Sequence, residues 1–188
     1  MLRRIMAVAL ASVLALAVAA PVALAEEQVC RGTIGSRTVD NLLVPQGATC
    51  TLNGTRVEGT VKVERNAQLF ANGIRVKGNV QSQGFRTVVL KEGSVVVGSV
   101  QLENGLVNGG GRVLNSRING DVQFFSNEAS MVARGNTVLA NLQANQNKGG
   151  LVISNNRISE NLQCKENNPP PTGGGNTAGD KEDQCARL

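Results

Sequence analysis

One short unit recurs along the chain, and it restricts the possible folds more than any other feature of the sequence. Each copy begins with a β-branched residue, followed four residues later by Val or Leu and five residues later by a polar residue. With that first residue as an anchor, the six copies start at Val57, Val76, Val96, Ile118, Val138 and Ile158. The spacings are 19, 20, 22, 20 and 20 residues, and Val39 marks a degenerate earlier copy. Units of this length indicate a solenoid, in which each unit buries its apolar face by stacking on its neighbours.

Apolar and polar residues alternate within each unit, as in Val61-Lys62-Val63, which is the period of a strand rather than of a helix. Turn signals such as Asn72-Gly73 and Asn104-Gly105 separate the alternating segments. At about 3.3 Å per residue, about 20 residues form a ring of three short strands and three corners. A β-sandwich also uses evenly spaced short strands, but it has no reason to repeat the residue type at each position. The consensus of a leucine-rich repeat is absent.

The predicted fold class is therefore all-β, a single-stranded parallel β-helix with coils of about 20 residues. The irregular period favours the right-handed form, since left-handed helices favour strict six-residue subrepeats.

Five places after the anchor the later units carry the same amide side chain, whereas the first has Lys62. These residues are Gln81, Gln101, Gln123, Gln143 and Gln163. Coils stack about 4.8 Å apart, so equivalent amides can hydrogen-bond along the axis. We expect an outward-facing ladder; contact with a ligand is the alternative role for this column.

Arginine precedes the anchor in four units, and these four residues are the candidate ligand-binding site. They are Arg56, Arg75, Arg117 and Arg157, and Val95 and Thr137 interrupt the column. A row of fixed guanidinium groups matches the repeating acidic groups of an anionic glycan or wall polymer. The alternative is a set of solvated corner residues.

The four cysteines are expected to close the two ends of the solenoid. Cys50 occupies the inward position seven residues before its anchor, which later coils fill with apolar residues: Leu69, Val89, Met131 and Leu151. Cys164 is also expected to point inward, but most of the coils separate it from Cys50, about 25 Å along the axis. A disulfide requires α-carbons within about 7 Å. Of the three possible pairings, only Cys30 with Cys50 and Cys164 with Cys185 satisfies this limit.

Residues 1–25 have the pattern of a secretory signal peptide. Arg3 and Arg4 precede an apolar run from Ile5 to Ala20, and the segment ends in Ala23-Leu24-Ala25, a small-x-small cleavage pattern. A membrane anchor is the alternative, but the apolar stretch is short. Export to an oxidising compartment agrees with cysteines that all follow this segment. The predicted location is secreted or cell-envelope, with no transmembrane segment after cleavage.

Composition excludes several classes of partner and chemistry. Removing residues 1–25 takes away two arginines and no acid, so the formal net charge falls from +5 to +3. The chain has no His, Trp or Tyr and four Phe, so it lacks aromatic platforms for single-stranded nucleic acid, and no nucleic-acid partner is expected. Without His or a short Cys-x-x-Cys pair, no zinc site, other metal site or cofactor is expected.

The predicted organisation has four parts. They are a signal peptide (1–25), an N-terminal cap (26–50), a parallel β-helix (51–166), and a Pro/Gly-rich loop with a disulfide-tethered tail (167–188). The caps are expected because the open ends of a solenoid expose core residues and unpaired strand edges.

The repeated Val-x-Gly-Asn-Val-Gln units resemble those of secreted bacterial right-handed β-helix repeat proteins of unknown function. The closing segments Asn161-Leu162-Gln163-Cys164 and Lys181-Glu182-Asp183-Gln184-Cys185 look like the tails of such exported proteins. A weaker resemblance, through Val57-Glu58-Gly59-Thr60-Val61, is to bactofilins, which polymerise end to end. Export and disulfide-capped ends depart from the bactofilin pattern. The resemblance to the secreted β-helix repeat proteins covers nearly the whole mature chain but implies no activity.

Other β-helix proteins are polysaccharide lyases and hydrolases, so a pair of catalytic carboxylates is an alternative role for the surface acids. Glu64 and Glu103 occupy the same repeat position two coils apart, about 10 Å, which is within the range for glycoside hydrolysis. Gln83 takes this position in the intervening coil, and no third acid joins the pair. The better interpretation is surface carboxylates, and no catalytic residue is assigned.

The sequence thus favours an exported, non-enzymatic structural or binding protein whose partner is an envelope polysaccharide or protein. A polysaccharide-active enzyme and a self-assembling scaffold are the alternatives, and the oligomeric state is not predicted.

Overall fold

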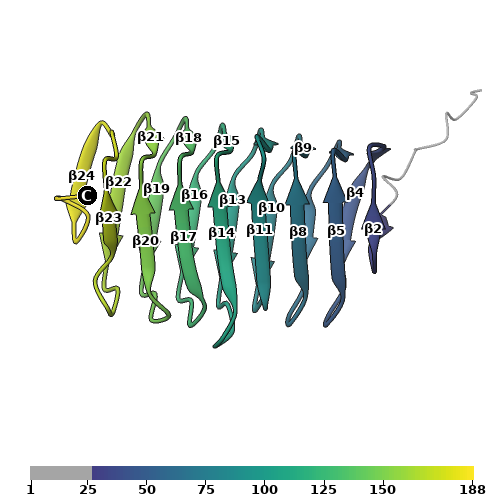
Figure 1. Ribbon diagram of the computed structural model, residues 1–188, viewed down its shortest axis with the longest axis horizontal. Helices are drawn as coiled ribbons and strands as arrows, with labels where there is room; N and C mark the ends of the chain where they lie inside the picture. Colours follow the sequence, from purple (N-terminus) through teal and green to yellow (C-terminus); the bar gives the residue numbers. More distant parts are fainter. Residues whose placement is uncertain (1–26) are drawn as a thin grey trace, which may run out of the picture.

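The computed structural model describes residues 27–188, and these residues form a β-solenoid (Figure 1). The chain winds through three parallel sheets in turn, so strands that are neighbours in a sheet come from successive coils. The predicted signal peptide lies outside the described residues. Within the described part of the chain, no helix is long and apolar enough to cross a membrane.

Sheet A has nine strands and carries the glutamine column. Its strands are β1 (Glu27–Val29), β4 (Asn41–Val44), β7 (Val61–Val63), β10 (Val80–Gln83), β13 (Val100–Glu103), β16 (Val122–Phe125), β19 (Leu142–Asn145), β22 (Asn161–Lys165) and β24 (Asp180–Asp183).

Sheet B has eight strands, most of them four or five residues long. They are β2 (Thr33–Ile34), β5 (Thr49–Asn53), β8 (Gln68–Asn72), β11 (Thr87–Lys91), β14 (Gly110–Leu114), β17 (Ser130–Arg134), β20 (Leu151–Ser154) and β23 (Thr172–Gly174).

Sheet C has seven strands of two residues each, and in six of them the second residue is a repeat anchor. They are β3 (Thr38–Val39), β6 (Arg56–Val57), β9 (Arg75–Val76), β12 (Val95–Val96), β15 (Arg117–Ile118), β18 (Thr137–Val138) and β21 (Arg157–Ile158).

The anchors form one buried line along the axis. Each anchor pairs in register with the next, from Val39 against Val57 to Val138 against Ile158. The six anchors from Val57 onward are at most 4% exposed. The predicted all-β parallel solenoid and its coil length are confirmed, whereas its right-handed sense stays a prediction.

The register of sheet B corrects one expected core position. Val88, rather than Val89, continues the inward column after Leu69. The corner between β11 and β12 contains Glu92, Gly93 and Ser94, one residue more than the corner between β8 and β9. The extra residue shifts the strand by one place relative to its anchor, and a shift of one residue reverses which side chains face inward.

The N-terminal segment is not the separate cap that was predicted over 26–50. Strands β1, β2 and β3 make a coil of their own, and they pair with β4, β5 and β6 respectively. The wall of the solenoid therefore already includes β1, since backbone pairing continues where the sequence repeat has become degenerate.

The C-terminal segment 167–188 also corrects the prediction. Its Pro/Gly-rich part was expected to be an irregular loop, but β23 pairs with β20, and β24 pairs with β22. The glycines of β23 allow this close approach, since a Cβ at Gly173 would collide with the backbone of Ile153. The solenoid therefore continues past residue 166.

Both predicted disulfides are present. Cys30 and Cys50 have α-carbons 5.6 Å apart, and Cys164 and Cys185 have α-carbons 5.2 Å apart. All four cysteines are buried. Disulfide bonds form and persist in oxidising compartments, which supports an extracytoplasmic location.

Candidate functional site

The four candidate arginines lie on one face of the solenoid, each as the first residue of a sheet C strand. Arg56 pairs with Arg75, and the column then continues through Val95, Arg117, Thr137 and Arg157 in register. All four arginines are exposed. The structure therefore brings the predicted residues into a single line, which is called the arginine column below.

The surroundings of the arginine column contain few compensating charges. None of the fourteen strand residues of sheet C is acidic. Among residues 27–188 the ion pairs are Lys77 with Glu58 and Lys91 with Glu92, so the four column arginines are in none. Their side chains also make no hydrogen bond within this part of the chain. The guanidinium groups are thus available to a ligand.

The corner between sheets B and C, which precedes each position of the arginine column, carries mostly small residues. Two residues before each column position stands a glycine or asparagine with positive φ, a conformation that glycine adopts without strain. Examples are Gly54, Gly73 and Asn155, with φ of 64°, 59° and 55°. Apart from Glu92, no residue of this corner carries a long exposed side chain.

The predicted glutamine ladder is confirmed on the outward face of sheet A. The Nε2 of each glutamine donates to the Oε1 of the next at 2.6 to 3.1 Å, from Gln81 through to Gln163. Gln163 then donates to a carboxylate oxygen of Glu182 on β24. Every amide keeps at least one N–H and one acceptor lone pair for other partners.

Two further ladders, both of buried asparagines, were not predicted from the sequence. One occupies the corner between sheets A and B, with Asn127, Asn147 and Asn167. The other, with Asn136, Asn156 and Asn176, occupies the corner between sheets B and C. Each side chain donates to a backbone carbonyl and accepts from the preceding coil. Their recurrence at the same interval as the repeat is a signal that could have revealed them.

A hollow of about 510 Å³ lies on sheet A beside the first part of the glutamine ladder. Glu64 and Glu103, the carboxylates considered for catalysis, both line it, with Gln83 between them. Glu64 accepts a hydrogen bond from the backbone N–H of Gln46 at 2.9 Å. The hollow also contains Lys62 and Arg65, so its lining is of mixed charge.

Two more hollows lie further along the solenoid, and sequence reasoning did not anticipate them. Glu103 also lines the second, of about 520 Å³, together with Phe125 and Asn145. A third, of about 660 Å³, lies at the corner between sheets A and B. Three side chains, Ser126, Gln146 and Glu166, line both of these hollows. Within residues 27–188, no group of three or more His, Cys, Asp or Glu side chains could hold a metal ion.

No protein-family model, curated protein or solved structure matches the chain.

Proposed function

We propose that the protein is an exported, non-enzymatic rod that binds a linear anionic polymer of the cell envelope along sheet C. The observation that carries this proposal is the arginine column: four exposed guanidinium groups in register, with no acidic residue in the strands that bear them. Export is supported by the two disulfides and by the signal-peptide pattern of residues 1–25.

The spacing of the column suits a polymer rather than a small anion. Arg75, Arg117 and Arg157 follow one another at intervals of two coils, which is about 10 Å at the usual stacking distance. A single small anion can contact only one of these positions at a time. A chain with regularly spaced carboxylates or phosphates can engage all three, and simultaneous contacts raise the overall affinity.

The rigidity of the face also favours such binding. The arginines stand on a wall whose backbone is hydrogen-bonded between coils on both sides. The α-carbons of the column are therefore already in position, so only the side chains lose freedom when a polymer binds.

The test compares two variants with the same change in charge. In the first, Arg56, Arg75, Arg117 and Arg157 are all replaced by Ser. In the control, four exposed arginines away from the column are replaced by Ser: Arg65, Arg86, Arg112 and Arg134. Retention is measured by affinity electrophoresis in gels that contain polygalacturonate or a teichoic acid, with dextran as the neutral polymer.

The column variant is expected to lose retention by about tenfold or more, and the control variant is expected to keep most of it. Equal losses in both variants would show that net charge alone attracts the polymer, and the proposal would be rejected. Unchanged retention of the column variant would reject it as well. Release of new reducing ends or unsaturated products from the polymer would instead support the enzyme alternative.

A further inference from the structure

The repeat is interrupted at the corner between sheets A and B that precedes β14. This corner consists of residues 104–109, whereas the corner before it is 84–86 and the one after it is 126–129. The longer corner projects beyond its neighbours in Figure 1. Val107, within it, is 60% exposed. Insertions in solenoids tend to gather on a binding face.

Hydrogen bonds to neighbouring coils and within the corner hold residues 104–109 in one conformation. The N–H of Leu106 donates to the carbonyl of Phe85 at 2.9 Å, and the N–H of Gly109 donates to the carbonyl of Leu106 at 2.9 Å. The N–H of Gly105 donates to Oδ1 of Asn127 at 2.8 Å. The buried ring of Phe85 fills the space beside Gly105, where a Cβ would lie 2.5 Å from its Cζ. The insertion therefore forms a fixed wall.

The third hollow lies against this wall and joins the second hollow on sheet A. Leu106, from the wall, and Glu128 and Lys148, from the next two corners, line the third hollow. The side chains common to both hollows are already connected, since Ser126 donates to Gln146 at 3.3 Å and Gln146 donates to Glu166 at 2.9 Å. Together the two hollows form one preorganised depression, called the corner hollow below.

The lining of the corner hollow is polar without a dominant charge. Three carboxylates, Glu103, Glu128 and Glu166, are nearly balanced by Lys148 and Lys165. Amides and a hydroxyl supply both donors and acceptors. Such a lining suits a neutral ligand rich in hydroxyl groups, because a hydroxyl both donates and accepts hydrogen bonds.

Phe125 adds an apolar surface at the edge of the corner hollow. It is the outward residue of β16, lies in register with Glu103 and Asn145, and is partly exposed. The other residues in its column are polar in the neighbouring coils, so an outward phenylalanine is unusual there. An aromatic ring beside hydrogen-bonding groups can pack against the C–H face of a sugar ring.

We propose that the corner hollow binds a neutral oligosaccharide, with Phe125 under a sugar ring and the Ser126–Gln146–Glu166 ladder contacting its hydroxyl groups. This site is separate from the arginine column, since no column arginine lines either hollow. The rod would then hold an anionic polymer on sheet C and a neutral glycan at the corner between sheets A and B.

The test is an NMR titration of the ¹⁵N-labelled, disulfide-bonded protein with cellohexaose, xylohexaose, mannohexaose and chitohexaose. At least one of these probes is expected to shift the resonances of Phe125, Ser126 and Gln146. Phe125→Ala is expected to weaken that binding by about tenfold. The matched control is Phe70→Ala, because Phe70 is also a partly exposed phenylalanine but lies on sheet B.

The proposal is overturned if none of the four probes shifts these resonances, if the shifts fall on sheet B or sheet C, or if Phe70→Ala weakens binding as much as Phe125→Ala. The variant that lacks all four column arginines is expected to bind the oligosaccharide normally. Failure of the polymer test with success here, or the reverse, separates the two proposals.

Discussion

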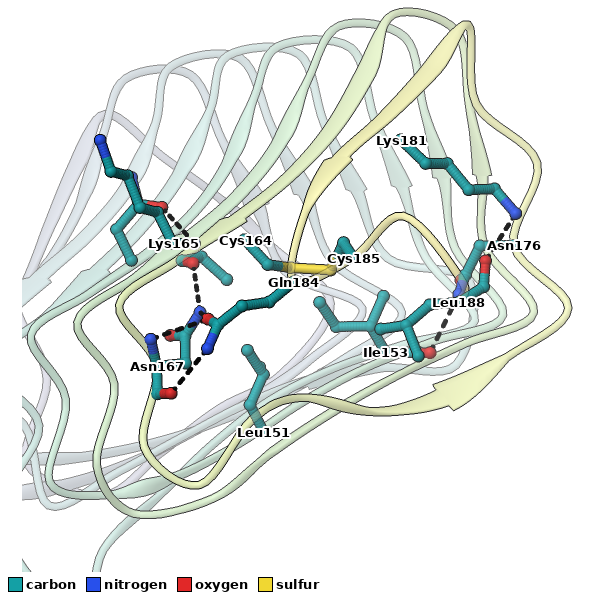
Figure 2. Close-up of a disulfide and its surroundings, with 12 residues drawn as sticks. Leu151, Ile153, Cys164, Lys165, Asn167, Asn176, Lys181, Gln184, Cys185 and Leu188 are labelled. Atoms are coloured by element: carbon teal, nitrogen blue, oxygen red, sulfur yellow. Dashed lines mark hydrogen bonds between the residues drawn. A yellow bond between two sulfur atoms is a disulfide. The ribbon is translucent and has the colours of Figure 1, made fainter.

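The two ends of the rod are stapled by disulfides that close almost equal lengths of chain, yet they are finished differently. At the N-terminal end, the disulfide between Cys30 and Cys50 joins two successive coils, and the two cysteines are 20 residues apart in sequence. At the C-terminal end, Cys185 follows β24, and the tail turns inward across the end of the core (Figure 2). Leu188 packs against the core cluster there.

The C-terminal tail also ends the asparagine ladder of the corner between sheets A and B. Gln184 accepts from the backbone N–H and from Nδ2 of Asn167, and it donates back to the carbonyl of Asn167. Figure 2 shows these groups facing one another beside the disulfide. The asparagine ladder at the corner between sheets A and B passes its hydrogen bonds toward the next coil, so its last member, Asn167, needs a substitute acceptor. The direction of this ladder therefore explains why its terminator, Gln184, stands at the C-terminal end.

The largest effect is expected from removing one staple at a time. Replacing Cys164 and Cys185 by Ala should lower the free energy of unfolding by about 3 kcal/mol from loop closure, and further as the tail contacts are released. Replacing Cys30 and Cys50 by Ala should remove a similar loop-closure contribution with fewer added losses, since the two loops are nearly the same length. Denaturant titration compares the two variants.

Amide hydrogen exchange shows which strands lose protection in each variant. The C-terminal variant should lose protection in β22 and β24, and the N-terminal variant in the strands of the first coil, because solenoids open from their ends. A larger loss of stability in the N-terminal variant would contradict the comparison of the two ends.

A smaller effect is expected at the ladder terminator. Gln184→Ala leaves two buried N–H groups of Asn167 without their protein acceptor, which should cost about 1 to 2 kcal/mol in thermal or denaturant unfolding. Gln184→Glu retains the acceptor oxygen but loses the N–H that donates to the carbonyl of Asn167, so its stability should lie between those of the Ala variant and the unmodified protein. If the Ala variant were as stable as the unmodified protein, water would be an adequate terminator and the tail would not be needed for this purpose.

The smallest effect concerns the surface glutamine ladder. Glu182→Ala removes the acceptor of Gln163 and should cost about 0.5 to 1 kcal/mol, because the pair is partly solvated. Lys62→Ala, at the opposite end of the column, should change stability by less than about 0.5 kcal/mol, since Lys62 makes no side-chain hydrogen bond to Gln81 within residues 27–188. Calorimetry measures the loss of stability in each variant. Equal losses would indicate that the two ends of the glutamine ladder do not differ in their need for a hydrogen-bond partner.

Much of the fold was predictable because a solenoid converts recurrence in sequence into alignment in space. The anchors, the glutamine column and the arginine column each follow from the single spacing of the repeat. The disulfide pairing followed from the same spacing, because it fixed how far apart the cysteines lie. The recurrence of the anchors also placed them in one column, although the sheet C strands that contain them are only two residues long.

Positions that depend on corner length were not predictable. One extra residue before β12 moved the inward position to Val88, and no repeat pattern indicated which corner contains it. The prediction also ended the solenoid too early at both ends. Backbone pairing tolerates the departures from the consensus in β2 and β23, because strands are joined through main-chain groups that every non-proline residue has.

The sequence alone therefore determined the axis, the period and the columns, since each is a property of residues one coil apart. Only the tertiary structure decided on which sheet each column lies, that Phe125 stands beside the hollows, and that Gln184 contacts Asn167. These relations depend on how the corners bend and how the tail folds back. Both are set by packing between segments that share no repeat position.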